Sequence, residues 1–330
     1  MDRARGSGPR GRGFKSRRAH YFFGMVMKFL DTIEERLLKE LNPKVKLVLK
    51  TGKYIVESGG KRLRPLFTVL TCGMCGQEPE RAVPLGVGLE YIHVASLLHD
   101  DVVDGAERRR GKKSANLVFG NGVAVLTGDY MYAKALHLFS TYGNVEMIKL
   151  VSQAVMDMAE GQVLEISKVG DIISEEEYFQ IIDGKTAVLF GACFGVGALA
   201  GSCKNWEKLY EVGLRIGRAF QLIDDALDYE GNPETLGKPV GNDLKEGKCT
   251  YPLISVLELL DKEEVKKALR GLSDYETLRQ KVIELGGVEK TKERAKKELK
   301  MAKEILKDFP ENEYKKDILG LIDFVINRNI

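Results

Sequence analysis

The segment SLLHDDVVDGAERRRG (residues 96–111) decides how the rest of the chain is interpreted. It places Asp100, Asp101 and Asp104 in the spacing DDxxD at the end of an apolar run. On a helix, Asp100 and Asp104 lie one turn apart on the same face. Carboxylates at this spacing suit Mg²⁺, a hard ion that keeps several waters and also takes phosphate oxygens as ligands. For this motif alone, a solvated acidic helix end is the simpler alternative.

A second segment, FQLIDDALDYEG (residues 220–231), repeats the spacing with Asp224, Asp225 and Asp228. Both motifs follow apolar runs, so we expect the acids at the ends of core helices rather than on a charged surface. Two such helices facing each other would pair their carboxylates as metal-binding helical bundles do. The two motifs together therefore predict metal ions clamped around a polyanion such as a diphosphate.

Basic residues next to turns and helix starts would supply the further cations that a diphosphate needs. Three of them follow a Gly pair in the segment GGKRLRP (residues 59–65). Other basic and polar residues lie beside the acidic motifs, at the start of an apolar segment or after glycines: Arg109, Arg110, Lys185, Thr186, Lys238 and Lys248. Each could be an ordinary surface residue, but their shared attachment to the acidic motifs favours a single site.

Length and patterning favour one large helical domain. The chain has 330 residues, of which 44% are hydrophobic and 30% charged, which allows a sizeable core. Helical periodicity dominates, strand-type alternation is nearly absent, and no Pro/Ser-rich linker divides the chain. We therefore predict an all-α fold, a large single-domain helical bundle around a deep central cavity, over residues 25–330. The expected helices are 25–41, 44–58, 63–75, 80–104, 122–139, 144–166, 175–182, 186–201, 206–230 and 250–260, amphipathic helices over 262–308, and 312–328.

Residues 186–203 need to be tested as a membrane span, because no charge occurs over these positions. They barely reach spanning length and are rich in glycine and alanine. A central helix buried on all sides explains them better, since small residues let neighbouring backbones approach closely.

Charge is concentrated at the N-terminus. Residues 1–20 carry seven basic groups and one acid, so the body of the chain is slightly acidic and is not a basic nucleic-acid binder. The Gly/Arg-rich start has too little apolar surface to fold, so we expect a disordered extension over residues 1–24. Five scattered cysteines suit a reduced, cytoplasmic protein, and the CxxC formed by Cys72 and Cys75 has no second pair that would indicate zinc.

These motifs resemble those of the trans-isoprenyl (polyprenyl) diphosphate synthases. The segments GGKRLRP, LLHDDVVD, RRG, GKTA, FQLIDDALD and GKPVGNDLKEGKCTYP occur in that family's order, from about residue 29 to the C-terminus. The resemblance implies the isoprenoid synthase fold and a homodimer. It also implies Mg²⁺-dependent head-to-tail condensation of isopentenyl diphosphate onto an allylic diphosphate, with roughly three ions per site. The enzyme would be soluble, and its product would end in a membrane.

The resemblance also implies roles for individual residues. Isopentenyl diphosphate would be bound by Lys61, Arg64 and His93, with help from Arg110. Asp100 and Asp104 would bind Mg²⁺ with support from Asp101, and Asp224 and Asp228 would hold a third metal ion with Asp225 alongside. The allylic diphosphate would be held by Arg109, Lys185, Thr186, Gln221, Lys238 and Lys248. The residues expected to be catalytic are Asp100, Asp104, Lys185 and Asp224. For His93, a satisfied core histidine is the alternative.

The sequence also predicts the approximate length of the product. Gly88, Ile92 and Ala95 form a stripe leading away from the first acidic motif, and this stripe would wall a tunnel for the growing tail. Short-chain members of the family place a bulky aromatic residue five positions before the first aspartate, where this chain has Ala95. We therefore predict a product longer than C20, in the range C30 to C50, with Met131 or Tyr132 as candidates for the tunnel floor.

Several alternatives remain open at this point. A geranylgeranyl or farnesyl diphosphate synthase would share the motifs but make a shorter product. A head-to-head synthase or terpene cyclase would not need the second set of basic residues. A non-catalytic subunit of a heteromeric synthase would not need both acidic motifs intact. A general magnesium-binding scaffold would leave the basic motifs unexplained.

Overall fold

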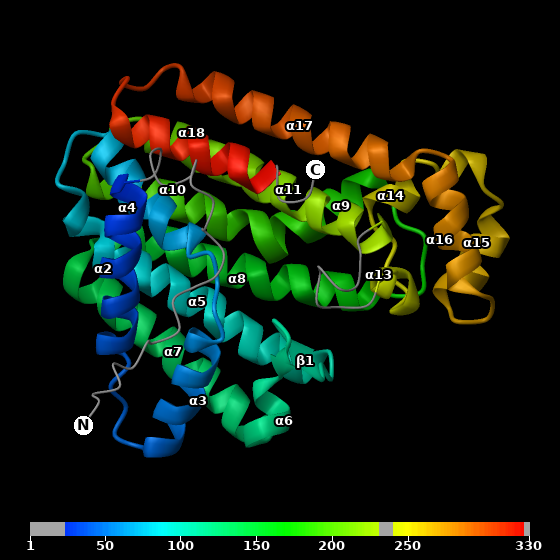
Figure 1. Cartoon of the computed structure of the whole chain (residues 1–330), viewed down its shortest axis with the longest axis horizontal. Coiled ribbons are helices and arrows are strands. Elements are labelled where there is room, and N and C mark those ends of the chain that lie inside the picture. The colour runs from blue at the N-terminus through cyan, green and yellow to red at the C-terminus, as the bar shows by residue number, and fades with distance from the viewer. Residues whose placement is uncertain (1–23, 231–239, 327–330) are drawn as a thin grey trace, which may run out of the picture.

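The computed structural model describes residues 24–230 and 240–326. The expected extension over residues 1–24 therefore lies almost entirely outside the described residues, and Lys238 lies outside them too. The described chain is built almost wholly from helices, as predicted (Figure 1). The longer helices are α2 (Gly24–Glu40), α3 (Lys46–Glu57), α4 (Leu63–Met74), α5 (Val83–Val103), α7 (Asn121–Tyr142), α8 (Val145–Lys168), α9 (Glu175–Ile182), α10 (Val188–Ala200), α11 (Trp206–Glu230), α15 (Lys262–Leu269), α16 (Tyr275–Glu284), α17 (Gly287–Leu306) and α18 (Glu313–Ile326).

Short elements connect the longer helices. The only strands in the described part are β1 (Arg108–Arg109) and β2 (Lys112–Lys113), which pair antiparallel just after α5. The short helical turns are η1 (Pro79–Ala82), α6 (Ala115–Phe119), η2 (Asp183–Ala187), α13 (Asn242–Lys245), α14 (Tyr251–Ile254) and η3 (Leu257–Leu259). Of these, η2 is a π-helical turn that joins α9 to α10 without a break.

The centre of the bundle is α10, which packs against α4, α8 and α11. Nearly all its residues are buried, as expected for a helix that is apolar on every side. Glycines allow this packing: a Cβ on Gly197 would lie 2.4 Å from the Thr68 carbonyl oxygen of α4, and one on Gly213 of α11 would lie 2.3 Å from the Phe190 carbonyl oxygen. At these glycines the backbones of neighbouring helices pack directly against each other, with no side chain between them.

One helical stretch within the described residues, Glu175–Ala200, is long and apolar enough to cross a membrane by length and composition. However, 83% of its most apolar window is buried inside the protein. This burial confirms the interpretation of residues 186–203 as a core helix.

Figure 1 shows how the other helices surround this centre. α17 and α18 cover one side of the bundle, α15 and α16 lie at one end, and α5 leads to the β1–β2 hairpin. α11 packs along α17 on its outer side and along α10 on its inner side. The ends of α5 and α11, where the two acidic motifs lie, are thus fixed by long helix–helix contacts.

Three details differ from the sequence-based expectations. The single helix expected over 250–260 is instead α14 followed by η3, because Val256 leaves the helical region with φ −123° and ψ 6°. The hairpin after α5 and the short helix α6 were not predicted, since two-residue strands carry no alternation to read. Residues 183–185, which lie between the helices expected over 175–182 and 186–201, belong to the continuous π-helical turn.

Candidate active site

The first acidic motif ends α5. Asp100 is half-buried and Asp104, the C-terminal cap of the helix, is exposed. Burial raises the pKa of Asp100, the charge of Asp104 raises it further, and Lys185 on η2 opposes the shift. The pKa of Asp104 is likewise raised, because surrounding protein removes part of the hydration of its carboxylate even though the residue is exposed, and Lys248 and Lys185 oppose this shift. These carboxylates therefore lie in the field of lysines that come from distant parts of the chain.

Asp101, the middle aspartate, turns the other way. Its carboxylate is completely buried, and its Oδ1 accepts hydrogen bonds from Arg109, at 2.8 Å from Nε and 2.7 Å from Nη2. Arg109 lies on β1, so the motif is tied to the hairpin that follows it. Asp101 thus holds Arg109 in place beside the outer carboxylates.

The second acidic motif, on α11, repeats this division in its first two acids. Asp224 is half-buried, whereas Asp225 is buried and accepts hydrogen bonds from the Tyr178 hydroxyl (2.5 Å) and the Gln221 amide (2.9 Å). Burial, together with the neighbouring aspartates, raises the pKa of Asp225 to about 7 although both hydrogen bonds oppose the shift. Asp228 is also buried, and its Oδ2 accepts a hydrogen bond from the Asp243 backbone amide at 3.0 Å.

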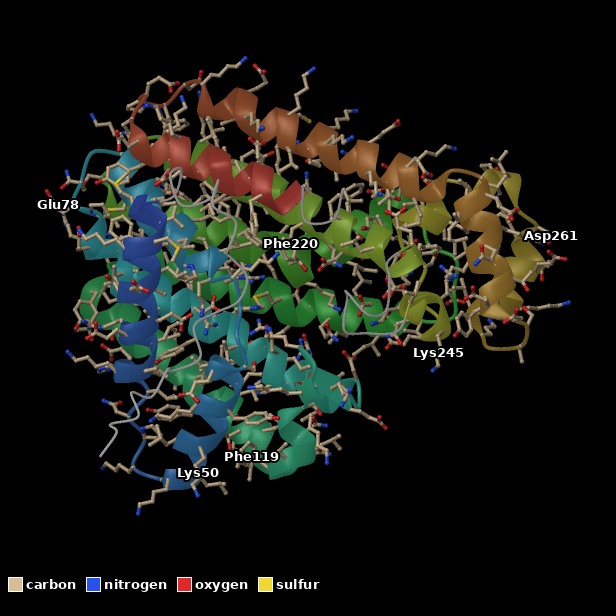
Figure 2. The ribbon with its side chains drawn as sticks, in the orientation of Figure 1. Lys50, Glu78, Phe119, Phe220, Lys245 and Asp261 are labelled. Carbon is tan, nitrogen blue, oxygen red and sulfur yellow. The ribbon has the colours of Figure 1, made fainter. Side chains whose placement is uncertain are left out.

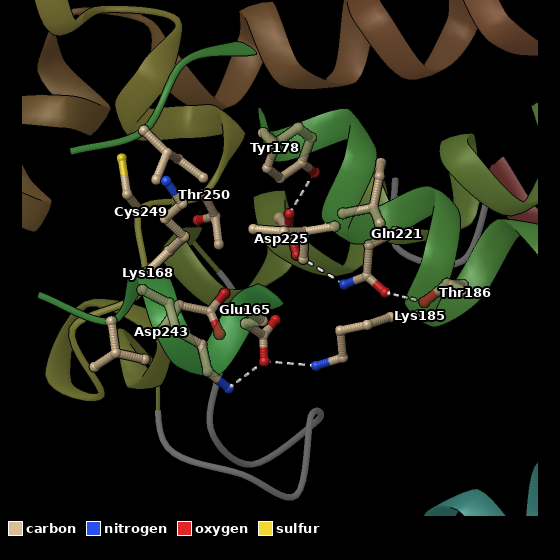
Figure 3. A pocket seen from close by; sticks show the side chains of 15 residues that line it. Glu165, Lys168, Tyr178, Lys185, Thr186, Gln221, Asp225, Asp243, Cys249 and Thr250 are labelled. Carbon is tan, nitrogen blue, oxygen red and sulfur yellow. Dashed lines mark hydrogen bonds and ion pairs between the residues drawn. The ribbon is translucent and has the colours of Figure 1, made fainter. Parts of the chain in front are cut away.

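A pair of lysines lies between the two motifs. Lys185 Nζ lies 2.6 Å from Glu165 Oε1 of α8, and Lys248 Nζ lies 3.5 Å from the same oxygen and 2.8 Å from Glu246 (Figure 3). Burial would raise the pKa of Glu165, but the two ammonium groups lower it, so this carboxylate stays ionised. Glu165 was not predicted, because nothing in the local sequence distinguishes it from a surface glutamate on α8.

Thr186 and Gln221 connect the lysine pair to the second motif. The Thr186 hydroxyl is 2.9 Å from Gln221 Oε1, and the same Gln221 donates to Asp225. Figure 3 shows these side chains around one cavity, which has about 120 Å³ of free volume. Its lining includes Glu165, Tyr178, Lys185, Thr186, Gln221, Asp225, Asp243 and Lys248.

The basic loop before α4 supplies a further group of cations. Lys61 Nζ lies 4.7 Å from the centre of the Phe324 ring, and the Arg64 guanidinium lies 4.6 Å from the Phe190 ring. Phe190 in turn contacts Phe220, which Figure 2 places near the middle of the bundle. Burial and the surrounding arginines, Arg64 and Arg110 foremost, lower the pKa of His93 well below its usual value, so this imidazole is neutral.

Arg62, between these two cations, has a different role. It adopts a left-handed backbone conformation (φ 50°) that turns its side chain into the protein. There it bonds to Glu34 (2.7 Å), Glu90 (3.0 Å) and the Val56 carbonyl (2.7 Å). Arg62 therefore fixes the loop to α2, α3 and α5.

The stripe expected to wall a tunnel faces α7. At its acidic end, the His99 ring lies 5.5 Å from the Tyr132 ring, and its Nε2 lies 2.9 Å from the Val125 carbonyl. At its far end, a Cβ on Gly88 would lie 2.9 Å from Phe139 Cε2. Ile92 and Ala95 are buried between these contacts, as is Met131 on α7. Tyr132 therefore lies next to the acids, and Phe139 is the bulky side chain at the opposite end.

Comparison with known proteins identifies the family of this chain. The family model for polyprenyl synthetase matches residues 45–285. The chain belongs to the polyprenyl synthetase family. Octaprenyl diphosphate synthase of Escherichia coli (strain K12) is 38% identical to it over 308 residues, covering 90% of this chain and 95% of that protein. The all-trans-nonaprenyl-diphosphate synthase of Rhodobacter capsulatus is 36% identical over 311 residues, covering 92% and 96%.

A solved structure of the family has the same fold. The polyprenyl synthase from Caulobacter crescentus CB15, complexed with calcium and isoprenyl diphosphate, superposes with a TM-score of 0.88 at 33% identity, covering 94% of this chain and 97% of that one. The predicted all-α fold and the resemblance to polyprenyl synthases are thereby confirmed. This family member is a prenyltransferase.

Proposed function

We propose that this prenyltransferase condenses isopentenyl diphosphate head to tail onto an allylic diphosphate and makes a trans-polyprenyl diphosphate longer than C20. The observation that carries the proposal is electrostatic. The first acidic motif lies in the field of one lysine pair, Lys185 and Lys248. The same two lysines line a cavity together with Gln221 and Asp225 of the second motif. Acids alone would serve a metal scaffold, whereas acids and lysines together suit a metal-bound diphosphate.

The outer carboxylates fit a divalent cation. Asp100, Asp104 and Asp224 offer oxygen ligands of the kind that Mg²⁺ prefers. No group of three acidic, histidine or cysteine side chains in residues 24–230 and 240–326 converges as a ready metal site. Mg²⁺ is commonly bound through one or two carboxylates and completed by water and phosphate oxygens. When bound, it would supply charge neutralisation to the departing diphosphate.

The chain's own residues would position both substrates. Lys185, Lys248, Thr186 and Gln221 would bind the allylic diphosphate with Arg109, which Asp101 orients, and Lys238 would join them from outside the described residues. Lys61 and Arg64, with neutral His93 as a hydrogen-bond partner and Arg110 nearby, would bind isopentenyl diphosphate.

In this arrangement the allylic C–O bond breaks and the double bond of isopentenyl diphosphate attacks the carbocation. Loss of a proton then restores an alkene, and the released diphosphate would be its acceptor. The aromatic side chains of Phe190, which is buried, and Phe220, which is half-buried, would exclude water from the cation.

Product length would depend on Phe139. At 1.5 Å per residue, α5 offers about 18 Å between Asp100 and Gly88 and about 22 Å to Leu85. An isoprenoid unit has four chain carbon–carbon bonds of about 1.5 Å and advances by roughly 5 Å, so this path holds about four units. Leu85 also borders a separate cavity of about 430 Å³ at that end of the bundle, with Tyr142, Met147 and Leu199. A longer tail would pass Phe139 and continue into this cavity.

We also propose that the enzyme is a cytoplasmic homodimer. Large apolar side chains are exposed on α7 and α8, including Leu126 and Val163, each 66% exposed. On α8, Met156, Val163 and Ile166 lie on one face, and exposed apolar faces of this size are typical of association surfaces. A second copy of the chain is the expected partner. Light scattering should give twice the chain mass, and Val163→Arg should shift it toward the monomer.

The decisive experiment measures incorporation of labelled isopentenyl diphosphate with each allylic primer, followed by mass analysis of the products. Activity should vanish with EDTA and return with Mg²⁺ while the circular dichroism spectrum stays helical. Asp100→Asn and Asp224→Asn should each lower kcat by about 10²–10³-fold, since each removes charge from the transition-state environment. Asp308→Asn, an exposed acid paired with Lys208, is the control. A wild-type chain that transfers no prenyl group under any of these conditions would refute the proposal.

A further inference from the structure

The π-helical turn η2, which presents Lys185 and Thr186, is held on two sides. On one side, Gly184 packs against α8 so closely that a Cβ there would lie 2.8 Å from the Asp157 carbonyl oxygen and 2.9 Å from Gly161 Cα. On the other side, Asp183, the first residue of the turn, makes a bidentate ion pair with Arg218 of α11. Arg218 Nε lies 2.6 Å from Asp183 Oδ1 and its Nη2 lies 2.7 Å from Oδ2.

The position of this ion pair links the two halves of the site. Arg218 lies three residues before Gln221 on α11, so the two side chains occupy the same face of the helix. Asp183 lies two and three residues before Lys185 and Thr186 on the turn. The bidentate pair and the Thr186–Gln221 hydrogen bond therefore join the same two elements at adjacent points.

The physical properties of the pair favour a fixed geometry. A planar guanidinium facing a carboxylate with two parallel hydrogen bonds defines both distance and orientation, which a single ammonium contact does not. Both side chains are about three-quarters buried, with 23% and 27% of their surfaces exposed, so solvent screens the pair only partly. Arg218 also lies 5.8 Å from the centre of the Phe179 ring on α9, the helix that leads into the turn. A π-helical turn is an uncommon backbone form that is frequent at functional sites, and it needs such support.

We propose that Asp183 and Arg218 are positioning residues that clamp η2 to α11 and so aim Lys185 and Thr186 at the allylic diphosphate. The identity of the ligand rests on the proposed function, whereas the clamp rests on the Asp183–Arg218 contacts themselves. Neither residue touches the diphosphate in this scheme; each acts through the turn or the helix that carries a binding residue.

The test is a double-mutant cycle of Asp183→Asn, Arg218→Gln and the two combined. Each single variant should lower kcat/KM for the allylic substrate by about 10- to 100-fold, since a misplacement of about 1 Å costs that much. KM for isopentenyl diphosphate should stay unchanged, because Lys61 and Arg64 lie on other elements. The double variant should lose no more than the worse single variant, since the pair acts as a unit. Arg218→Lys should recover only part of the loss, because it keeps the charge without the fork.

Arg215→Gln is the matched control. Arg215 lies one turn earlier on α11, where it bonds to Glu298 of α17 (3.0 Å) and Glu211 of α11 (2.7 Å) instead of to η2. Glu298 also lies 3.9 Å from Arg218, but Arg218 keeps its bidentate pair with Asp183 in this variant. Arg215→Gln should therefore lower thermal stability without changing the allylic KM of the folded protein. If Arg215→Gln and Arg218→Gln had the same kinetic effect, or if the double-mutant losses were additive, the clamp would be refuted.

Calorimetric binding of inorganic pyrophosphate with Mg²⁺ separates this inference from the proposed function. The clamp predicts that Arg218→Gln binds pyrophosphate at least tenfold more weakly than wild type and Arg215→Gln do. This prediction holds whether or not the protein catalyses prenyl transfer. Equal binding by all three proteins would overturn the clamp and leave the prenyl-transfer proposal standing. If Arg218→Gln binds pyrophosphate at least tenfold more weakly than wild type, but wild type transfers no prenyl group, the clamp stands and the prenyl-transfer proposal is overturned.

Discussion

Replacing Ala95 by phenylalanine should shorten the product. Ala95 lies five residues before Asp100 on α5, and its side chain is completely buried on the stripe that faces α7. A phenyl ring there would block the path of the growing tail between these helices. The proposed diphosphate site lies C-terminal to Ala95, at the end of α5, so its acids and lysines should stay in place.

The size of the effect follows from helix geometry. Five residues at 1.5 Å per residue place the block about 7.5 Å from Asp100 along α5. At roughly 5 Å per isoprenoid unit, only one or two units fit before the block. Because the allylic unit adds to these, the main product should be about C10 to C15. Overpacking should also lower the free energy of unfolding by about 1–3 kcal/mol. We expect the variant to remain folded despite this loss.

Mass analysis of products from labelled isopentenyl diphosphate, at equal concentrations of folded protein, measures this shift. Val94→Phe is the matched control, since Val94 is equally buried but one position round the helix, on another face. It should reduce activity through overpacking while leaving product length unchanged. An Ala95→Phe enzyme that is folded and active, and that still makes the wild-type product, would show that the tail does not follow this stripe.

Three further predictions follow from buried groups. Phe139→Ala should lengthen the product by at least one unit, at about 3–5 kcal/mol in stability, and an unchanged product distribution would contradict a barrier at Gly88. Burial raises the pKa of Asp317 on α18 to about 6. The native state therefore holds this proton up to about pH 6, the unfolded state releases it near pH 4, and stability falls as pH rises through this window. In urea unfolding experiments, Asp317→Asn should therefore raise the free energy of unfolding relative to wild type by about 1–2 kcal/mol more at pH 7.5 than at pH 4.5. A difference between the two proteins that does not depend on pH would contradict a raised pKa of Asp317. Arg62→Ala should destabilise the fold by about 3–5 kcal/mol, because Glu90 is left buried without its partner; a loss below about 1 kcal/mol in the same assay would contradict this.

The sequence indicated the parts of the site that repeat a local pattern. Asp100 and Asp224 could be recognised because each follows an apolar run with the same spacing, and the buried helix α10 because no charge interrupts it. Glu165 could not be recognised, since its role depends on two lysines that reach it from η2 and from the segment before α14. Nor does the motif GGKRLRP show that its middle cation turns inward, which depends on one left-handed residue, Arg62.

The π-helical turn shows the same limit. An Asp-Gly pair favours a turn by its own preferences, and this pair lies in the gap between the helices expected over 175–182 and 186–201. Contacts with α8 and α11 override this preference, because Gly184 fits where no side chain would and Asp183 finds Arg218. Tertiary partners thus decide the local conformation at the residues that present Lys185.

The DDxxD spacing has a physical reason that the structure makes visible. Along a helix, residues i and i+4 share a face while residue i+1 points about 100° away. In both motifs the first acid is only half-buried, whereas the middle acid is buried among protein donors: Asp101 with Arg109, and Asp225 with Gln221 and Tyr178. The middle acid thereby orients a group predicted to bind the diphosphate, Arg109 in one motif and Gln221 in the other. One short pattern thus provides a carboxylate for the ligand side and a second that fixes the neighbouring binding group, which explains why two adjacent acids are useful despite their repulsion.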